Sequence, residues 1–281
     1  MRPPSFKSIE SPKNPVIAEF VDCFSRGNSR KRPYIPVEGS QMIREAIQAG
    51  LQVEAGLFHQ GFLDSGEGPA TLDACSASPA RLYRTSERLL RKTAATENPQ
   101  GILALIRKPV VANLGRIVSA RVPVLALVDV QDPGNCGALI RTFLAFGGRL
   151  AVTVGSSADL YGPKVVRASA GSILRVVALH FPTTGEFRKT APLDSLPWVA
   201  TSPSAGIPPQ HCAVEPPFVL LIGNEGSGLE ADILAACQER ISLPTSQSVD
   251  SLNAAVAGSL VLYELARSLR FGPFYQETAT L

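Results

Sequence analysis

Two residue types that build metal centres and disulfide frameworks are scarce in this sequence. Its 281 residues include three histidines, and none of them is spaced as a ligand pair. The cysteines are scattered, odd in number and form no Cys-x-x-Cys pair: Cys23, Cys75, Cys136, Cys212 and Cys237. Zinc sites and disulfide frameworks both need paired or closely spaced ligands, so this usage disfavours both. We therefore expect reduced thiols, a cytosolic type of compartment and no metal.

Long apolar runs are also missing. No stretch approaches the roughly 20 apolar residues that a membrane-spanning helix needs, so we expect no membrane association. The first fifteen residues, MRPPSFKSIESPKNP, place no apolar segment behind their basic residues, which argues against a secretory signal. The acidic residues Glu10 and Glu19 argue weakly against an organellar transit peptide. We expect a cytoplasmic, globular protein, because 45% apolar and 18% charged residues provide ample material for a core.

Net charge is small, at +3, but it is unevenly distributed. Residues 1–110 hold fifteen Lys and Arg against eleven Asp and Glu, whereas residues 111–281 hold twelve against thirteen. The basic residues are densest at Arg26, Arg30, Lys31 and Arg32. An excess of this size fits either an ordinary solvated surface or an electrostatic footprint for a polyanion such as RNA.

The N-terminal part alternates helical and strand patterns. Apolar spacing predicts helices over 16–27 and 40–50, the second ending at Gly50. We also expect a strand over 53–59, an amphipathic helix with one basic face over 81–92 and a strand over 101–109. Such alternation over about a hundred residues predicts a small α/β domain over 1–108, followed by a linker over 109–122.

The C-terminal part repeats a strand–helix pattern. Its first strand, VPVLALVDV (122–130), is a continuous apolar run typical of a strand buried on both faces. Further strands are expected at 149–155, 173–181, 218–226 and 239–244, before a last helix over 253–270. This pattern predicts a mostly parallel sheet covered by helices on both faces, in a domain over 123–281.

Ligands of open parallel sheets bind beyond the carboxyl ends of the strands, so the segments that follow the strands deserve most weight. The first is DPGNCGALIRTFLAFG (132–147), where Asn135 stands at a helix entrance and Arg141 lies off the apolar stripe of the helix. Taken alone, Asn135 could be a helix cap and Arg141 a surface residue. However, Pro133, Gly134 and Gly137 clear side chains from an entrance whose free N–H groups favour an anion.

Two further strand ends carry polar residues among small ones. LLIGNEGSGL (220–229) holds Asn224 and Glu225 in a glycine-rich turn that is neither a Gly-x-Gly-x-x-Gly motif nor a phosphate-binding Walker loop. SQSVDSLNAAVAGSL (246–260) places Ser251 and Asn253 before a helix of small residues. Asp250 or Ser251 could simply cap that helix, and the small residues could allow close packing. Neither explanation accounts for three such entrances at three strand ends.

Taken together, in this order and spacing, the three stretches resemble the signature motifs of the SpoU/TrmH-type RNA 2′-O-ribose methyltransferases of the SPOUT superfamily, the third motif being ISLP (241–244) followed by SLNAAVAGSL. The resemblance covers residues 123–281. More loosely, VEGSQMIREAI and NPQGILAL resemble the small ribosomal-protein-like RNA-binding domain often found in this family. The resemblance implies a parallel sheet with a C-terminal trefoil knot, an exception to the rule against knots. It also implies bound S-adenosylmethionine and a homodimer formed through the C-terminal domain.

The resemblance also implies site residues, position by position. Asn135, Arg141, Glu225, Ser251 and Asn253 match the family's active-site positions. The cofactor pocket would use Gly223, Leu243 and Leu252, largely through backbone groups around the adenine. Cys136 and Phe143 depart from the family's usual residues, but both lie on the expected buried face, so the departure concerns packing and not chemistry.

The family usually gives Arg141 the role of proton acceptor, yet a guanidinium keeps its proton in proteins. Our hypothesis is that Arg141 clamps a neighbouring phosphate and orients the hydroxyl, while Asn135 and Ser251 position the ribose. Glu225 and Asn253 would fix the surrounding loops.

The substrate would be ribosomal RNA in preference to transfer RNA. One alternative is a non-catalytic RNA-binding or ribosome-assembly factor that keeps the fold. Another, a dinucleotide-dependent dehydrogenase, is disfavoured because no Gly-x-Gly-x-x-Gly follows the first strand of the sheet.

Overall fold

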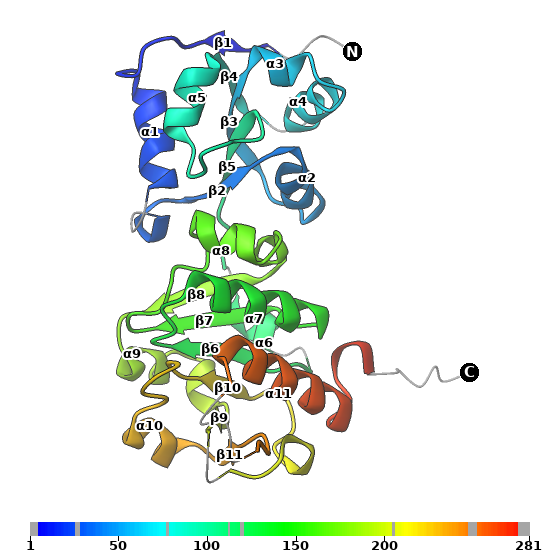
Figure 1. The fold of residues 1–281 in the computed structure, drawn as a ribbon. Coiled ribbons are helices and arrows are strands. Elements are labelled where there is room, and N and C mark those ends of the chain that lie inside the picture. The colour runs from blue at the N-terminus through cyan, green and yellow to red at the C-terminus, as the bar shows by residue number, and fades with distance from the viewer. Residues whose placement is uncertain are drawn as a thin grey trace, which may run out of the picture. The chain divides into compact units, whose positions relative to one another are not determined.

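The computed structural model describes residues 5–25, 29–76, 79–111, 113–118, 121–203, 206–246 and 252–274. The chain forms two compact units, each with its own sheet (Figure 1). The first unit comprises Met1–Val110 and Tyr161–Arg175, and the second comprises Val111–Leu160 and Val176–Leu281. A short segment from the middle of the chain therefore packs with the N-terminal residues.

The first unit contains a five-stranded sheet in the order β1-β4-β3-β5-β2. β1, β4 and β3 run parallel, whereas β5 is antiparallel to both of its neighbours. The carboxyl ends of β1, β3 and β4 therefore lie at one edge of the sheet. The strands are β1 (Lys7–Ser8), β2 (Tyr34–Glu38), β3 (Val53–His59), β4 (Arg81–Thr85) and β5 (Ile102–Arg107).

Helices cover this sheet on both faces. α1 and α5 share one apolar cluster with β3 and β5, in which Phe20, Leu57 and Leu90 are fully buried. α2 ends at Gln48, and Gly50, the expected stop, follows two residues later with a φ of +76°. The helical elements are α1 (Pro15–Phe24), η1 (Ser29–Lys31), α2 (Ser40–Gln48), α3 (Gln60–Leu63), α4 (Gly68–Ser76), α5 (Glu87–Thr93), α8 (Pro163–Ala168) and η2 (Ser172–Arg175).

The prediction of a single helix over 81–92 is wrong. Residues 81–85 form β4, paired with β3 and β1, and α5 begins only after Ser86. The Ser86 side chain caps α5 by accepting a hydrogen bond from the Leu89 N–H at 3.3 Å. The segment therefore divides at Ser86, where a capping residue ends the strand and begins the helix.

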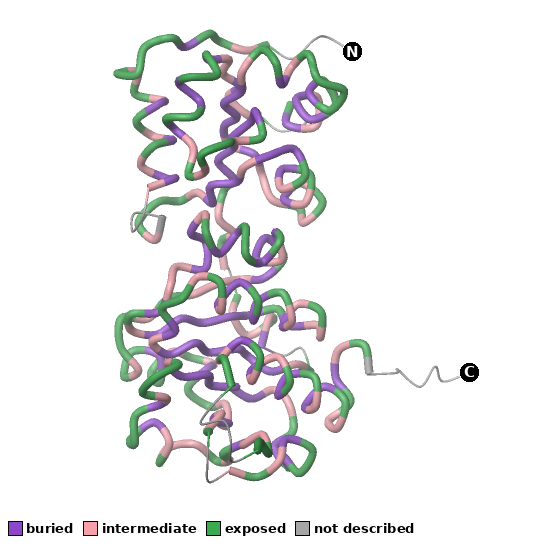
Figure 2. Tube along the Cα trace, viewed as in Figure 1, coloured by how far each residue is buried: buried purple, intermediate pink, exposed green. Residues whose placement is uncertain are grey.

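The second unit contains a six-stranded sheet in the order β11-β9-β10-β6-β7-β8. Every pairing in it is parallel, which confirms the predicted parallel sheet. Its central strands are buried along their whole length, as Figure 2 shows. The strands are β6 (Val124–Val128), β7 (Leu150–Val154), β8 (Val177–Phe181), β9 (Trp198–Thr201), β10 (Val219–Ile222) and β11 (Glu239–Ile241).

This second sheet is covered on both faces too. One face packs against α6, α9 and α10, through residues such as Val118, Phe187 and Ile233. On the other face, α7 packs against α11, and Ile222 of β10 reaches the backbone of α11 at Gly258. The helical elements are α6 (Leu114–Val118), α7 (Pro133–Ala145), α9 (Thr184–Arg188), η3 (Leu193–Ser195), η4 (Pro209–His211), α10 (Ala231–Ala236), α11 (Ala254–Ser268) and η5 (Gly272–Phe274).

The strand order creates a topological switch point between β6 and β10. From β6 the chain builds outwards through β7 and β8, whereas β9 and β11 lie beyond β10 on the opposite side. Connections leave β6 and β10 in opposite directions, and ligands of parallel sheets usually bind at the carboxyl edge near such a point. The first two polar stretches follow these two strands, so the fold brings them to the same place.

The segment predicted as a linker, 109–122, includes helix α6. Its residues Leu114, Ile117 and Val118 pack against the core of the second unit. In the described part of the chain, no helix has the length and apolar character required to cross a membrane.

Candidate active site

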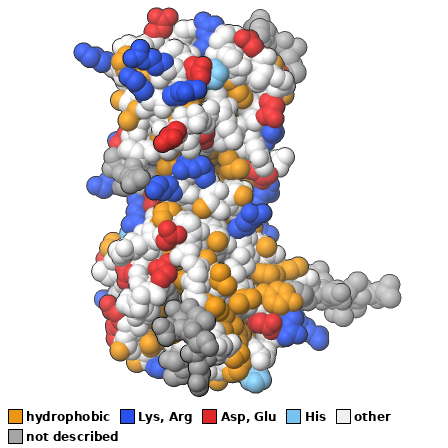
Figure 3. Space-filling view, in the orientation of Figure 1, with side chains coloured by type: hydrophobic (Ala, Val, Ile, Leu, Met, Phe, Trp, Pro, Cys, Tyr) orange, Lys and Arg blue, Asp and Glu red, His pale blue; other side chains and the backbone are white. Residues whose placement is uncertain are grey.

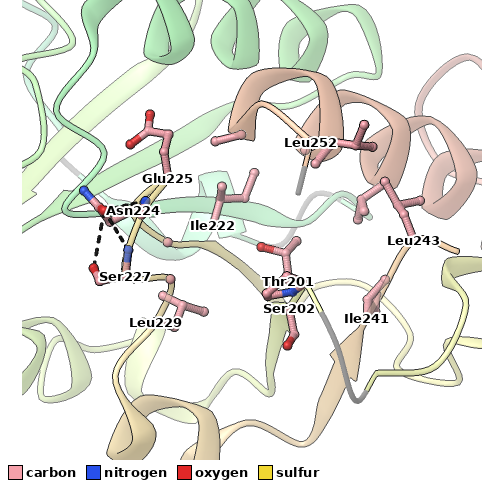
Figure 4. Close-up of a pocket in the computed structure, with 18 of the residues that line it drawn as sticks. Thr201, Ser202, Ile222, Asn224, Glu225, Ser227, Leu229, Ile241, Leu243 and Leu252 are labelled. Atoms are coloured by element: carbon pink, nitrogen blue, oxygen red, sulfur yellow. Dashed lines mark hydrogen bonds between the residues drawn. The ribbon is translucent and has the colours of Figure 1, made fainter. Parts of the chain in front are cut away.

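A cavity of about 540 Å³ opens at the carboxyl ends of β9, β10 and β11 and beneath the start of α11. This volume lies within the range of about 300–1,000 Å³ that is usual for small-molecule sites. Figure 4 shows Leu243 and Leu252 on one side of the cavity, the turn at Asn224 and Glu225 on the other, and Thr201 and Ser202 nearby. The three residues predicted to bind a cofactor, Gly223, Leu243 and Leu252, all line it.

Asn224 holds the glycine-rich turn that walls the cavity. Its Oδ1 accepts hydrogen bonds from the backbone N–H of Gly226 at 2.8 Å and of Ser227 at 3.1 Å. A Cβ at Gly223 would lie 2.6 Å from the Gly228 carbonyl oxygen, closer than real Cβ atoms approach backbone. The turn therefore closes on itself only with glycine at 223, which leaves backbone groups facing the cavity.

Asp129 ties this turn to the end of β6. Its backbone carbonyl accepts a hydrogen bond from Asn224 Nδ2 at 3.0 Å. Its Oδ1 accepts two more, from the N–H and the hydroxyl of Ser156, both at 2.7 Å. Asp129 has a φ of +55°, a conformation that is uncommon outside glycine and tolerated best by Asn and Asp. The strained residue is thus fixed on both sides and supports the turn of the cavity.

Three of the predicted catalytic residues form one chain of hydrogen bonds across the switch point. Asn253 Nδ2 donates to Asn135 Oδ1 at 3.0 Å, and Asn135 Nδ2 donates to Glu225 Oε1 at 2.7 Å. Glu225 also lines the cavity. The segments that follow β6 and β10 and the start of α11 therefore meet at its rim.

The N-cap of α11 sets the direction of this chain. Asn253 Oδ1 accepts from the N–H groups of Ala255 at 2.9 Å and Val256 at 3.2 Å, so Asn253 caps the helix. The sequence had suggested Asp250 or Ser251 for that role. Because the oxygen of Asn253 is engaged, its NH₂ group faces Asn135, whose own NH₂ group then faces Glu225. The same side chain, Asn253, therefore caps the helix and sets the orientation of the Asn135 amide.

Of the two other predicted catalytic residues, Arg141 takes no part in this chain. Arg141 is exposed on α7, and within the described ranges no carboxylate pairs with it. Ser251 lies outside the described residues. The suggestion that Asn135 caps α7 is wrong: Asp132 is the N-cap, and its Oδ1 accepts the Asn135 N–H at 2.7 Å. The side chain of Asn135 is thereby free for its two site contacts.

The small residues of α11 allow close packing within the chain itself. A Cβ at Gly258 would lie 2.5 Å from Leu139 Cδ2 and 2.6 Å from Ile222 Cδ1. The Thr142 and Ser259 hydroxyl oxygens are 2.9 Å apart across the same α7–α11 contact. Glycine at 258 therefore lets α11 lie against α7 and the sheet, with its first turn over the cavity.

Sequence reasoning missed Asp129, Thr201 and Ser202. Thr201 ends β9 and Ser202 follows it; this four-residue strand was not predicted, so no strand end pointed to them. Asp129 fell inside the strand predicted over 122–130, whereas β6 ends at Val128, and its positive φ could not be predicted from the sequence pattern.

Titratable groups in the structure do not gather as a metal centre. In the described ranges, no group of three or more His, Cys, Asp or Glu side chains is placed to hold an ion. Four thiols, of which three are buried and that of Cys237 is half-buried, have raised pKa values, mainly because burial disfavours the thiolate: about 11 for Cys23, Cys75 and Cys237, and about 12 for Cys212. They are protonated at neutral pH and poor nucleophiles.

Models of known protein families match both units of the chain. The SpoU rRNA Methylase family model matches residues 123–263, and a model of the MRM3-like substrate binding domain matches residues 25–104. The chain belongs to the SpoU rRNA methylase family.

Individual relatives match over almost the whole chain. The 23S rRNA (guanosine(2553)-2'-O)-methyltransferase RlmP of Bacillus subtilis is 29% identical, covering 92% of this chain and 99% of RlmP. A crystal structure of an RNA 2'-O ribose methyltransferase is 31% identical with a TM-score of 0.72, covering 93% and 98%. The SpoU methyltransferase AviRb from Streptomyces viridochromogenes, solved in complex with the cofactor AdoMet, is 27% identical with a TM-score of 0.80, covering 91% and 98%.

Proposed function

We propose that this protein uses S-adenosylmethionine to methylate a ribose 2′-hydroxyl of RNA, with ribosomal RNA as the substrate. The observation that carries the proposal is the Asn253–Asn135–Glu225 chain, which joins all three motif segments at the rim of the cavity. The family membership and the names of the relatives support the same chemistry. A binding protein without turnover has no evident need for this oriented set.

The cavity fits S-adenosylmethionine. Its glycine-rich turn offers backbone groups at Gly223 and Gly228, which suit the polar edges of an adenine and a ribose. Ile241, Leu243 and Leu252 provide apolar surface for a flat ring. The cofactor would supply a methyl group on a positively charged sulfur, already activated for transfer.

The protein's own residues would then mainly position the acceptor. Methyl transfer requires the attacking oxygen to lie in line with the methyl carbon, and fixing that geometry lowers the barrier. We assign the ribose to Asn135, held by Glu225 and Asn253, and to Ser251. Arg141, with an exposed charge, would bind the phosphate next to the target ribose and keep its own proton. Bulk water or that phosphate would take the proton of the hydroxyl.

We assign RNA binding to the N-terminal unit. This proposal rests on its match to a substrate binding domain and on the basic excess of residues 1–110. Ribosomal RNA is favoured over transfer RNA because RlmP is named as a 23S rRNA enzyme at 29% identity over almost its whole length. We place the protein in the cytoplasm, with ribosomal RNA.

We further propose that the protein forms a homodimer through α11. We also propose that the C-terminal domain of each subunit contains a trefoil knot. Val256, Leu260 and Tyr263 are between 41% and 50% exposed and are spaced along one side of α11. In Figure 3, hydrophobic side chains gather on the surface near this helix. An apolar stripe on one helix suits a two-fold interface in which the same residues face each other.

Mapping of 2′-O-methyl groups on ribosomal and transfer RNA, from cells with and without the protein, tests the activity. A methyl mark on ribosomal RNA that disappears with the protein is the expected result; marks lost from transfer RNA alone would contradict the substrate. Isothermal titration tests the cofactor, because NAD(H) binding without S-adenosylmethionine binding would contradict the proposal. Arg141→Ala should abolish turnover and leave cofactor affinity nearly unchanged; a large loss of affinity would contradict its assigned role.

A further inference from the structure

At one edge of the N-terminal sheet, three parallel strands end together. Ser8 of β1 and Phe58 of β3 both pair with Arg84 of β4, one residue before β4 ends. α5 starts two residues after β4, so its first turns stand at the same edge. Side chains from β1, from the residues before it and from α3 contact Arg84.

Arg84 is held in place by neutral groups. Its Nη1 donates to Gln60 Oε1 at 2.9 Å, its Nη2 donates to Ser8 Oγ at 3.0 Å, and its Cζ lies 5.3 Å from the centre of the Phe6 ring. Phe6 is anchored in turn, edge-on to buried Phe58, with their ring centres 5.4 Å apart. The guanidinium is therefore ordered while its positive charge is not cancelled by these partners.

Arg81, on the same strand, is held quite differently. It lies 3.4 Å from Glu19 Oε1 and 3.5 Å from Glu54 Oε1, and Arg107 pairs with Glu54 as well. These arginines have their charge balanced by carboxylates at the opposite end of the sheet. Within the described ranges, Arg84 forms no such ion pair. The contrast indicates that the stability of the fold does not depend on an arginine with an unbalanced charge at position 84.

Further cations lie on the neighbouring elements β1 and α5. Lys7 on β1 and Arg88 and Lys92 on α5 are exposed, and the last two are one helical turn apart. Lys and Arg side chains gather over β1 and α5 in Figure 3. Of the five N–H donors of a guanidinium, Arg84 uses two in the contacts described above, which leaves three for a ligand. An ordered, planar cation with spare donors is well suited to a phosphate oxygen pair.

We propose that this edge, formed by Phe6, Lys7, Arg84, Arg88 and Lys92, is the RNA-binding surface of the N-terminal unit. Arg84 donates to a backbone phosphate, and the lysines and Arg88 contact the phosphates beside it. The inference rests on the proposed function, since it supplies the RNA contact that the enzyme needs away from its cavity. Preorganisation by Phe6, Ser8 and Gln60 means that little side-chain freedom is lost when RNA binds.

Binding of an unmodified 23S ribosomal RNA transcript to the full-length protein tests this surface. Arg84→Gln should weaken binding about tenfold and lower the salt dependence by about one counterion, as expected when one phosphate contact is lost. Arg107→Gln is the matched control: the same charge is removed from an exposed arginine at the opposite end of the sheet, and RNA affinity should not change. S-adenosylmethionine affinity should stay at the wild-type value in both variants.

A second variant protects the test against misfolding. Arg88→Gln with Lys92→Gln changes only exposed side chains of α5 and should weaken RNA binding at least fivefold. Wild-type affinity in this double variant and in a folded Arg84→Gln protein would overturn the proposal. Failure of the proposed function is a separate result, because it would show as a wild-type protein that transfers no methyl group to RNA.

Discussion

Asn253 Nδ2 donates a hydrogen bond to Asn135 Oδ1 at 3.0 Å while Asn253 Oδ1 caps α11. One side chain therefore begins a helix with its oxygen and orients a neighbouring amide with its nitrogen. The two roles use different atoms, so substitutions can separate them.

Asn253→Asp keeps the oxygen cap but removes the donor to Asn135. Its free energy of unfolding should stay within about 0.5 kcal/mol of the wild-type value, as for most changes that keep packing and caps. Its kcat for methyl transfer should fall roughly tenfold to hundredfold, because Asn135 loses its orientation. Asn253→Ala should cost about 1 kcal/mol as well, since the cap is lost. Urea unfolding measures the free energy of unfolding of each variant, and single-turnover kinetics measures its rate of methyl transfer. A wild-type rate in Asn253→Asp would refute the orienting role.

Gly223→Ala should abolish cofactor binding. The new Cβ would lie 2.6 Å from the Gly228 carbonyl oxygen, so the turn that walls the cavity must open. Gly226→Ala is the control in the same turn, because its Cβ would meet only Asn224 Oδ1, at an ordinary 3.5 Å. Isothermal titration with S-adenosylmethionine should show a loss of affinity of at least tenfold for the first variant and a small change for the second. Equal affinities would exclude a backbone-lined binding turn.

Cys75 should make the stability of the protein fall at alkaline pH. Burial raises the pKa of its thiol from 9.0 to about 11, so the folded state retains a proton that the unfolded state releases first. The stabilisation is complete below about pH 9 and is lost as the pH rises through 11. A shift of this size corresponds to about 2–3 kcal/mol. In urea titrations across this range, Cys75→Ala should lose less stability than the wild type; parallel curves would contradict the assignment.

Val256→Glu with Leu260→Glu should convert a dimer into a monomer. Both side chains are exposed on α11, and two charges placed on a self-complementary stripe would face their copies. Val110→Glu is the control, because Val110 is 88% exposed and lies outside the second unit. Light scattering coupled to gel filtration gives the mass of each variant. A wild-type monomer, or a dimer that survives both charges, would rule out this interface.

The sequence predicted the sheet of the second unit well because its strands are continuous apolar runs, such as VLALV at 124–128. It also placed polar residues at shared strand ends, and three of them do meet at the cavity rim. The strand YIPVE was not predicted, because Pro36 weakens a strand pattern and its pairing with β5 is distant in sequence. The helix cap at Asn253 was assigned two or three positions too early, since Asp250, Ser251 and Asn253 are all good capping residues and only tertiary contacts choose among them.

The chain of site hydrogen bonds also has a consequence for biogenesis. It joins residues that are 118 and 90 positions apart, and its first member starts the last long helix of the chain. A nascent polypeptide that has completed the sheet strands but not α11 has no cap and no oriented amides. Under the proposed function, methyl transfer therefore requires that α11 has been synthesised and has folded onto the sheet, so a product that lacks α11 should leave RNA unmethylated.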